Sequence, residues 1–470
     1  MLKNKVPLKH PGSYKDPSGF IFSYRQQIYR QINHSYQAHY DRLMKSGLYQ
    51  QLNSAGKLVS HQEVDPDISP QAATCYKIIK PDQIDYINYP YEWSFSMLKD
   101  AALLTLEIQQ LALEKNMILK DASAYNIVFN HGQPIFIDSL SFENYVEETP
   151  WIAYRQFCQH FLAPLTLAAY QDLRFIPILR NFLDGFPLDF AAGLLPKKTL
   201  FNLNILLHIH GHAKSQSRWA DNRIKVSGKV KMSRQALWRL VDSLQLTVKN
   251  IKLSKQQTQW VDYYQQTSYS GTAFSEKQKI VKTYLLKIKK RLAARNTSLL
   301  DLGANNGEFS RLGLPNFKNI IAVDIDPMAV EFNYLASREN KETNLLPLVI
   351  DLTNPSPNLG LNLTERQSFL DRFKNCDAAM ALALIHHLSI TYNLPFENSA
   401  ELLAKFGKFL IIEFIPKDDS QVQILLKNRV DIFSDYNIGS FERVFGSKFK
   451  VLAKNLIPQS KRHLYLLEKK

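Results

Sequence analysis

The sequence predicts an α/β protein whose C-terminal half is a doubly wound parallel sheet, preceded by an α+β domain and a helical region. Two observations predict the sheet. From about residue 250 onward, short apolar runs alternate with helical stretches, as in successive strand–helix–strand units, and several of these runs end in an aspartate. A chain of 470 residues corresponds to two or three domains. We expect an α+β domain over residues 1–150, a helical region with a basic linker over 151–250, and the sheet domain over 251–470.

Five parallel strands are expected in the sheet domain, and a helix opened by Pro327 follows the second, because proline suits the first helical turn. The strands are 298–302, 320–324, 345–351, 377–384 and 409–414. Helices at 422–427 and 440–445 and an edge hairpin formed by 449–453 and 463–467 follow. This order predicts a Rossmann-like architecture.

The composition is that of a globular chain, with 45% hydrophobic and 21% charged residues, which excludes a mostly disordered protein. No apolar run reaches the ~18 residues of a membrane span, and the first residues lack the apolar core of a signal peptide. Cys75, Cys158 and Cys376 lie far apart. This spacing excludes a disulfide scaffold or a thiolate zinc site and favours a reducing, cytoplasmic location.

The chain has an excess of basic residues, 58 Lys and Arg against 43 Asp and Glu, for a net charge of +15. Such a surface attracts polyanions, namely nucleic acid, anionic lipid head groups or an acidic glycan; solvated helix faces are the alternative. Basic residues cluster in 214–239 and in 277–295. Few aromatic residues lie in these stretches, so nucleic acid bound by base stacking is not the favoured partner. The sequence indicates no oligomeric state.

A glycine-containing loop follows the first strand of the sheet and reads D-L-G-A-N-N-G, from Asp301 to Gly307. Gly303 and Gly307 allow a tight strand-to-helix turn and let a ligand approach the backbone. The acid before the first glycine would repel a pyrophosphate and suits a cationic ligand with an amino group, such as S-adenosylmethionine. Asp324 ends the second strand and can accept hydrogen bonds from a ribose diol. Asp351 ends the third strand, where it is positioned for the adenine amino group.

Residues 255–470 resemble the class I S-adenosylmethionine-dependent methyltransferases. The resemblance rests on four segments: D-L-G-A-N-N-G, A-V-D-I-D-P, V-I-D-L and D-A-A-M-A-L-A-L-I-H-H-L. It implies that Asp301 and Gly303 contact the amino-acid end of the cofactor, with Gly307 in the same loop. It also implies that Asp324 binds the ribose and Asp351 the adenine. A similar domain without a cofactor is the alternative.

A segment before the sheet, W-V-D-Y-Y-Q-Q-T-S-Y-S-G-T-A-F, resembles the lid that many such enzymes place over the cofactor. Within it, Tyr264 and Tyr269 are candidates to present aromatic faces to the sulfonium. Tyr269 is therefore counted among the expected cofactor-binding residues. Packing of both tyrosines in a core is the alternative.

Two histidines, His386 and His387, close the fourth strand in I-H-H-L, at the sheet edge where the site is expected. A histidine titrates near neutrality and can take a proton from a hydroxyl or carboxyl acceptor; a hydrogen-bonded core histidine is the alternative. Glu413, at the end of the fifth strand, is the next catalytic candidate. The resemblance favours an acceptor oxygen on a small molecule or saccharide, because the N/D-P-P-Y/F of amino-methylating nucleic-acid enzymes is absent.

A second motif lies in the N-terminal half, where Asp121 and Asn126 have the spacing D-x-x-x-x-N and an apolar strand then delivers Asp138. The order resembles the catalytic loop and metal-binding aspartate of kinase-like phosphotransferases. The resemblance implies Asp121 as base and Asn126 and Asp138 as Mg²⁺ ligands. No G-x-G-x-x-G loop or V-A-I-K strand precedes it, so a scaffold that no longer transfers phosphate is the alternative.

The alternating histidines in L-L-H-I-H-G-H have no accompanying carboxylate, so no metal site is expected there. They are His208, His210 and His212. The sequence therefore predicts a methyltransferase that moves a methyl group from S-adenosylmethionine to an oxygen of a small molecule or saccharide. The alternatives are a bifunctional or purely phosphotransferring enzyme and a non-catalytic adaptor that binds polyanions.

Overall fold

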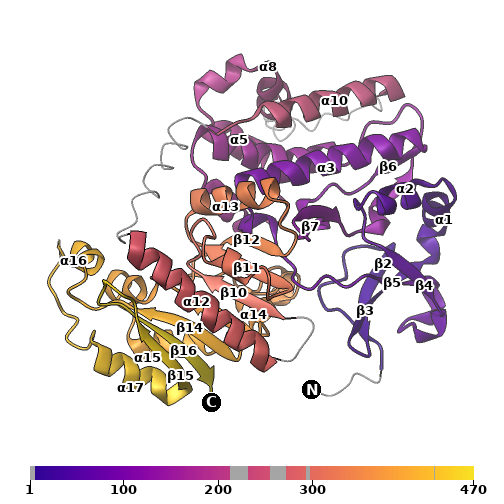
Figure 1. Ribbon diagram of the computed structural model, residues 1–470. Coiled ribbons are helices and arrows are strands. Elements are labelled where there is room, and N and C mark those ends of the chain that lie inside the picture. Colours follow the sequence, from indigo (N-terminus) through magenta and orange to yellow (C-terminus); the bar gives the residue numbers. More distant parts are fainter. Residues whose placement is uncertain (1–5, 212–230, 254–270, 293–296, 428) are drawn as a thin grey trace. The chain divides into compact units, whose positions relative to one another are not determined.

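The computed structural model describes residues 6–211, 231–253, 271–292, 297–427 and 429–470 (Figure 1). Contacts divide the chain into two compact units. Unit 1 comprises residues 1–254 together with 358–367, and unit 2 comprises 255–357 and 368–470. No helix in the described ranges combines the length and the apolar character that a bilayer span requires.

Unit 1 contains a five-stranded antiparallel sheet in the order β1-β2-β3-β5-β4. The strands are β1 (Leu8–Lys9), β2 (Gly19–Tyr24), β3 (Gln27–Asn33), β4 (His61–Val64) and β5 (Cys75–Pro81). Between β3 and β4 lie helices α1 (Gln37–Lys45) and α2 (Leu48–Ser54). Arg25 and Gln26, both at positive φ, form the two-residue turn between β2 and β3. A two-residue turn with positive φ at both positions matches the twist of the strands that it joins. Phe22 and Ile78 pack on one face of this sheet, and Ile32 and Ile79 pack on the other.

The long helix α3 (Phe95–Glu114) is capped by Ser94, and the rest of unit 1 comes after it in the chain. Two short antiparallel pairs come next: β6 (Met117–Leu119) with β9 (Phe142–Asn144), and β7 (Ile127–Asn130) with β8 (Gln133–Phe136). Further helices in the described residues are α4 (Tyr154–Phe157), α5 (Ala163–Tyr170), α6 (Phe175–Ile178), α7 (Leu188–Leu194), α8 (Leu203–Ile205), which continues as a π-helix over Leu206–His210, and α10 (Arg234–Asn250). Lys99 of α3 donates to the backbone oxygens of Lys249 and Ile251 at 2.9 and 2.8 Å, so α10 is fixed to α3.

Unit 2 is built on a seven-stranded sheet in the order β12-β11-β10-β13-β14-β16-β15. The strands are β10 (Ser298–Leu302), β11 (Asn319–Asp324), β12 (Leu345–Val349), β13 (Ala378–Ala381), β14 (Phe409–Phe414), β15 (Phe449–Leu456) and β16 (His463–Lys469). The first five pair in parallel and the last two form an antiparallel edge hairpin. The expected mixed α/β domain with a mostly parallel sheet is confirmed. The strand order reverses between β10 and β13, where open α/β sheets bind ligands.

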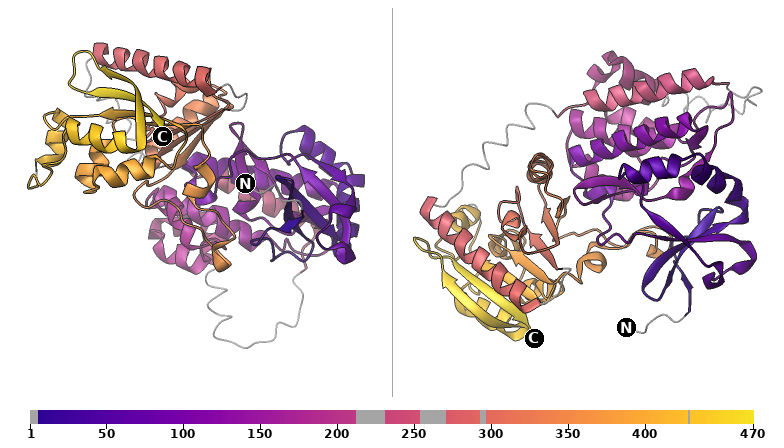
Figure 2. Two further views of the ribbon diagram at one scale, coloured as in Figure 1. Left: turned by 90° about the horizontal axis from the view of Figure 1, so that it is seen from below. Right: turned by 45° about the vertical axis from the view of Figure 1, so that its right-hand side comes forward.

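Helices cover both faces of this sheet (Figure 2). They are α12 (Gly271–Leu292), α13 (Pro327–Glu339), α14 (Phe369–Phe373), α15 (Phe396–Leu403), α16 (Ser420–Leu426) and α17 (Ile438–Lys448). Glu413 of β14 contacts α12, whereas the next residue, Phe414, packs on Phe396 of α15 and Phe441 of α17. Because successive strand side chains point to opposite faces, α12 covers one face and α15 with α17 the other. The α13 helix begins at Pro327, as expected, and Asp326 caps it.

Candidate functional site

The loop after β10 depends on its two glycines. Gly303 and Gly307 have φ of 75° and 80°, a left-handed region that other residues enter at a cost. A Cβ on Gly303 would lie 3.3 Å from the Leu384 side chain, and one on Gly307 would lie 2.3 Å from Asn333 Oδ1. The amides of Gly303 and Ala304 both donate to the Val323 oxygen at 2.9 Å. The loop is thereby fixed to the end of β11.

Asp301 is buried under this loop, with 2% of its surface exposed. The Ser310 hydroxyl donates to its Oδ2 at 2.6 Å. Burial raises the pKa of Asp301 to about 7, and the negative charge of Asp324 adds to this rise, while Ser310 and Lys277 oppose it. A cation placed against this carboxylate would favour its ionised form.

Asp324 ends β11 and Asp351 follows β12, at the same edge of the sheet. Asp324 accepts from the amides of Asn305 at 2.8 Å and Asp326 at 2.9 Å, and burial raises its pKa. Asp351 accepts from the amide and hydroxyl of Thr353 at 2.8 and 2.6 Å. Since each carboxylate oxygen has more than one acceptor site, both side chains keep capacity for a ligand.

The two histidines lie beyond the fourth strand, not on it. The expected strand 377–384 was too long: β13 ends at Ala381, because Ala383 adopts a φ of 48° and turns the chain away. His386 is buried, and in the described part of the chain its Nδ1 has no hydrogen-bond partner. Burial lowers the pKa of His386 to about 2, with help from the charges of His387, Arg462 and Lys277. His387 is exposed, its ring centre lies 4.2 Å from that of His386, and partial desolvation lowers its pKa.

Glu413 is held in a buried network. Lys277 of α12 lies 2.7 Å from its Oε2, and the side chains are 2% and 0% exposed. The same oxygen accepts from the Ala383 amide at 2.9 Å. Arg462 Nη1 lies 3.9 Å from Glu413 Oε1, and Arg462 also binds Asp419 at 2.7 and 2.9 Å. Glu413 therefore anchors the turn that follows β13.

Lys277 and Arg462 were not singled out in the sequence. Lys277 is one of several lysines in α12, and only its contact with β14 distinguishes it. Burial lowers its pKa, an effect that Glu413 opposes.

In unit 1, the three kinase-like residues lie together. Asp121 accepts from the Ser123 amide at 2.9 Å and is hydrogen-bonded to the Asn126 side chain. Burial raises the pKa of Asp121, and the nearby charge of Asp138 adds to the rise. Arg30 of β3 lies 2.6 Å from Asp138 Oδ1.

Two further residues of this cluster were missed in the sequence, Arg30 and Asp16. Asp16, from the connection between β1 and β2, lies 3.3 Å from Arg30 Nη2 and 3.5 Å from Lys120 Nζ. Lys120 also donates to the Ser18 hydroxyl at 2.7 Å. Strand alternation alone did not reveal that these groups, distant in sequence, converge.

The histidine run is helical, not a strand. His208 bonds the hydroxyls of Tyr154 at 2.8 Å and Ser243 at 3.1 Å, and His210 bonds that of Thr199 at 2.9 Å. These are structural hydrogen bonds. His212 lies outside the described residues, and within the described residues no group of three or more His, Cys, Asp or Glu could hold a metal ion.

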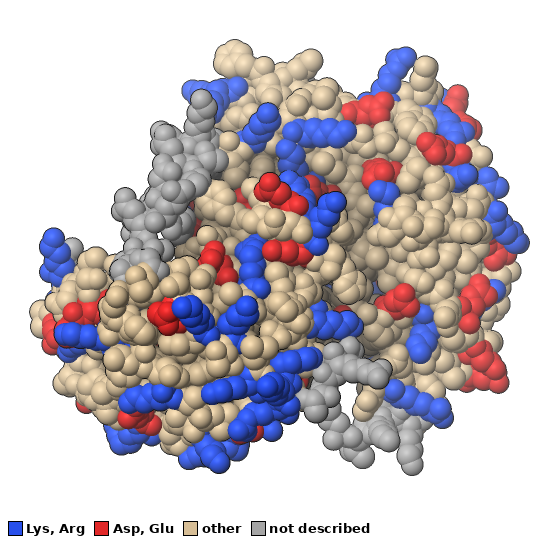
Figure 3. All heavy atoms as spheres, viewed as in Figure 1, with Lys and Arg blue, Asp and Glu red and all other residues tan. Residues whose placement is uncertain are grey.

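Several other expectations fall partly or wholly outside the described ranges. Tyr264 and Tyr269 of the expected lid do so, as does most of the basic stretch 214–239. In the second basic stretch, Lys277 is buried, while Lys289, Lys290 and Arg291 occupy the last turn of α12. Figure 3 shows Lys and Arg side chains gathered over this end of α12. Cations at the C-terminal end of a helix are attracted by the negative end of the helix dipole.

No family model matches the chain. Among solved structures, similarity extends to the bifunctional kinase-methyltransferase WbdD (15% identity, TM-score 0.29, 40% of this chain and 38% of that chain). It also extends to magnesium protoporphyrin IX methyltransferase from Synechocystis (14%, 0.33, 46% and 95%) and N-methyltransferase NodS from Bradyrhizobium japonicum (10%, 0.28, 40% and 93%). Likeness of this degree assigns no activity to the chain.

One curated relative matches over almost the whole length. Nodulation protein NoeA of Rhizobium meliloti is 34% identical over 472 aligned positions, covering 98% of this chain and 96% of the relative. The chain belongs to the family of nodulation protein NoeA.

Proposed function

We propose that unit 2 is an S-adenosylmethionine-dependent methyltransferase that acts on an oxygen of a small molecule or saccharide. One observation carries the proposal. Asp301 and Asp324 lie at the carboxyl ends of β10 and β11, and Asp351 follows the neighbouring parallel strand β12, beside a loop with two glycines at positive φ. The acids thus share one sheet edge on one side of the point where the strand order reverses.

The donor and acceptor groups at this edge fit the cofactor. The buried Asp301 carboxylate, whose pKa is raised, would be stabilised in its ionised form by the cationic amino group. Asp324 retains acceptor capacity for the ribose hydroxyls, and Asp351 retains it for the adenine amino group. The absence of a Cβ at Gly303 lets the loop pass close to the Leu384 side chain while its φ stays positive.

When bound, S-adenosylmethionine supplies a methyl group on a positively charged sulfur. Transfer of that methyl group to an acceptor hydroxyl would leave S-adenosylhomocysteine and release the hydroxyl proton, which a base of the protein would take up. We assign its acceptance to His387, which is neutral at neutral pH because its pKa is lowered, and which is exposed. His386 is a weaker base, since its pKa is about 2. Glu413 holds the turn between β13 and these histidines through the Ala383 amide.

Thermal unfolding with S-adenosylhomocysteine tests the proposal. A ligand that binds only the folded state raises the unfolding temperature, and Asp324→Ala removes two backbone hydrogen bonds and the ribose acceptor. We expect a shift in the parent and none in Asp324→Ala. Glu401→Ala, an exposed acid on α15, is the control and should keep the shift. No shift in the parent at millimolar ligand would contradict the proposal.

The second candidate function is phosphotransfer in unit 1, favoured by the convergence of Asp121, Asn126 and Asp138 with a cation on the third strand. Protein kinases carry a lysine on their third strand, and the groups that correspond to Asn126 and Asp138 hold Mg²⁺. Here the strand carries Arg30, and Asp16 already lies against Arg30 and Lys120. An internal anion in this position competes with a phosphate, so we propose a scaffold that does not transfer phosphate.

Calorimetric titration of the whole chain with Mg·ATP distinguishes scaffold from enzyme. We expect no heat of binding in the parent, and Asp138→Ala should change only the stability of unit 1. Micromolar affinity that requires Mg²⁺, is lost in Asp138→Ala and persists in Asp121→Ala would instead make the chain a bifunctional enzyme.

A further inference from the structure

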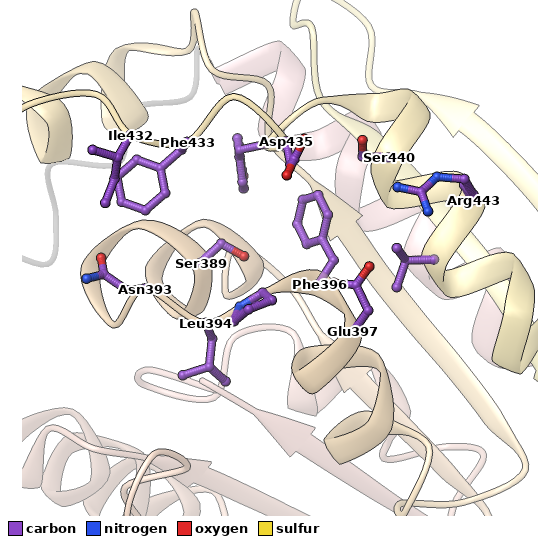
Figure 4. Close-up of a pocket in the computed structure, with 13 residues that line it drawn as sticks. Ser389, Asn393, Leu394, Phe396, Glu397, Ile432, Phe433, Asp435, Ser440 and Arg443 are labelled. Atoms are coloured by element: carbon purple, nitrogen blue, oxygen red, sulfur yellow. The ribbon is translucent and has the colours of Figure 1, made fainter.

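Unit 2 contains a cavity of about 260 Å³ on the other side of the strand-order reversal (Figure 4). One wall is the turn after β13, which includes Ser389, and continues into the start of α15. The opposite wall is the segment before α17, which includes Phe433 and Tyr436. Both walls follow the carboxyl ends of parallel strands, so the cavity lies at the same sheet edge as the three aspartates.

The walls are fixed by hydrogen bonds. Arg429 donates to Asn393 Oδ1 at 2.6 Å, and Lys417 donates to the Phe433 oxygen at 2.7 Å. The Tyr436 hydroxyl donates to the Ile415 oxygen at 2.7 Å, just after β14. The cavity is therefore largely formed before a ligand enters, as is usual for small-molecule sites.

One buried polar group in the cavity wall lacks a partner. Ser389 is 5% exposed, and no hydrogen-bond partner for its hydroxyl is present among the described residues. Buried hydroxyls are nearly always hydrogen-bonded in native proteins. Figure 4 shows Ser389 on one wall and Asp435 on the other, with the Phe396 ring beside them. The unpaired hydroxyl points to a ligand that can donate or accept a hydrogen bond here.

The remaining lining combines aromatic faces with charges of both signs. Phe396 and Tyr436 have ring centres 5.3 Å apart, and Phe433 lies beside them in the lining. Glu397, Asp435 and Arg443 are exposed at the rim, and the described structure gives none of them an ion pair. Aromatic rings suit the apolar C–H face of a sugar, while two carboxylates accept from hydroxyls and a guanidinium donates to them.

We propose that this cavity binds the methyl acceptor and that the acceptor is a neutral saccharide, of which one ring occupies the cavity. The inference rests on the methyltransferase function proposed above and names its substrate class. The volume lies just below the ~300–1,000 Å³ of sites for drug-sized ligands, which suits a single sugar ring. The two carboxylates disfavour an acidic acceptor, and Arg443 disfavours a cationic one. The wall that contains Ser389 belongs to the helical segment His387–Thr391, which begins at the residue assigned to accept the hydroxyl proton.

Titration of the whole chain, saturated with S-adenosylhomocysteine, with methyl glycosides of neutral hexoses and N-acetylhexosamines tests the inference. We expect at least one glycoside to bind. Ser389→Ala and Arg443→Ala should each weaken that binding about tenfold by removing a hydrogen bond. Both variants should bind S-adenosylhomocysteine as the parent does. Lys448→Ala, an exposed cation at the end of α17, is the control and should leave glycoside binding unchanged.

The possible failures are distinguishable. If S-adenosylhomocysteine binds and no glycoside does, the saccharide assignment is overturned while the methyltransferase proposal stands. Glycoside binding that neither Ser389→Ala nor Arg443→Ala weakens places the acceptor outside this cavity. If benzoate binds in place of a glycoside and Arg443→Ala abolishes its binding, the cavity is reassigned to an anionic ligand. If tetramethylammonium binds and Glu397→Gln abolishes its binding, the cavity is reassigned to a cationic ligand. Failure of S-adenosylhomocysteine itself to bind removes the function on which the inference rests.

Discussion

Replacing Lys277 with methionine removes the cation that neutralises Glu413 inside unit 2. The two groups are 2.7 Å apart and almost fully buried. After the change, Glu413 keeps the Ala383 amide, and Arg462 Nη1 lies 3.9 Å from its Oε1. A buried charge that loses its partner destabilises a protein by about 3–5 kcal/mol. In a domain of ~150–250 residues each kcal/mol lowers the unfolding temperature by ~2–4 °C, so we expect a decrease of roughly 6–20 °C for unit 2.

Differential scanning calorimetry of the whole chain measures this decrease. Amide exchange in peptides from α12 and β14 assigns the affected transition to unit 2. The matched control is Lys279→Met, on the same helix, because Lys279 is 71% exposed and its ion pair with Glu276 lies at the surface. It should change stability by less than about 1 kcal/mol.

The double variant Lys277→Met with Glu413→Gln separates charge from packing. It removes both charges while Gln can still accept from Ala383, so it should cost clearly less than the sum of the two single changes. Destabilisation by Lys277→Met no larger than by Lys279→Met would refute the reasoning. A double variant whose loss equals that sum would also refute it.

Three further predictions follow from the site. Because the pKa of Asp301 is raised to about 7 from 3.8, the folded chain binds a proton more tightly than the unfolded chain. The free energy of unfolding should therefore fall as pH rises from about 4 to 7. Asp301→Asn should flatten this pH dependence, measured by denaturation at several pH values. An unchanged pH dependence in Asp301→Asn would assign it to another titrating group. If Asp301 faces the amino group, S-adenosylhomocysteine affinity measured by calorimetry should increase from pH 6 to pH 8 in the parent and not in Asp301→Asn. Gly307→Ala should destabilise unit 2, because its Cβ would lie 2.3 Å from Asn333 Oδ1. Gly446→Ala, inside α17, places its Cβ where no atom lies within 4 Å and should stabilise unit 2 by about 0.5–1 kcal/mol. Equal effects of the two variants in urea unfolding would contradict this contrast.

The architecture of unit 2 was largely predictable because its strands are short apolar runs that leave little choice of partner. Strands 298–302 and 409–414 were placed at their observed bounds, and the hairpin β15–β16 was anticipated. The fourth strand was extended too far, since A-L-A-L-I continues the apolar pattern past Ala381. The turn at Ala383 is stabilised by a hydrogen bond from the Ala383 amide to Glu413, thirty residues later. The residues around Ala383 do not indicate this contact.

The contacts that bring distant residues together were not predictable. Lys277 reads as one more lysine of a basic helix, and Arg30 as one polar residue of a strand. Their partners, Glu413 and Asp138, lie far along the chain, and only the folded sheets bring them within 3 Å. Nor does composition indicate that residues 358–367 belong to unit 1. There Arg366 lies over the ring of Tyr125, 4.1 Å from its centre.

The central claim is that S-adenosylmethionine binds at the carboxyl edge of β10, β11 and β12. A crystal structure of the whole chain grown with S-adenosylhomocysteine tests it most directly. The account predicts that the ribose lies within hydrogen-bond distance of Asp324 and that the amino-acid end lies beside Gly303. A ligand bound elsewhere in unit 2, or no ligand at saturating concentration, would contradict it.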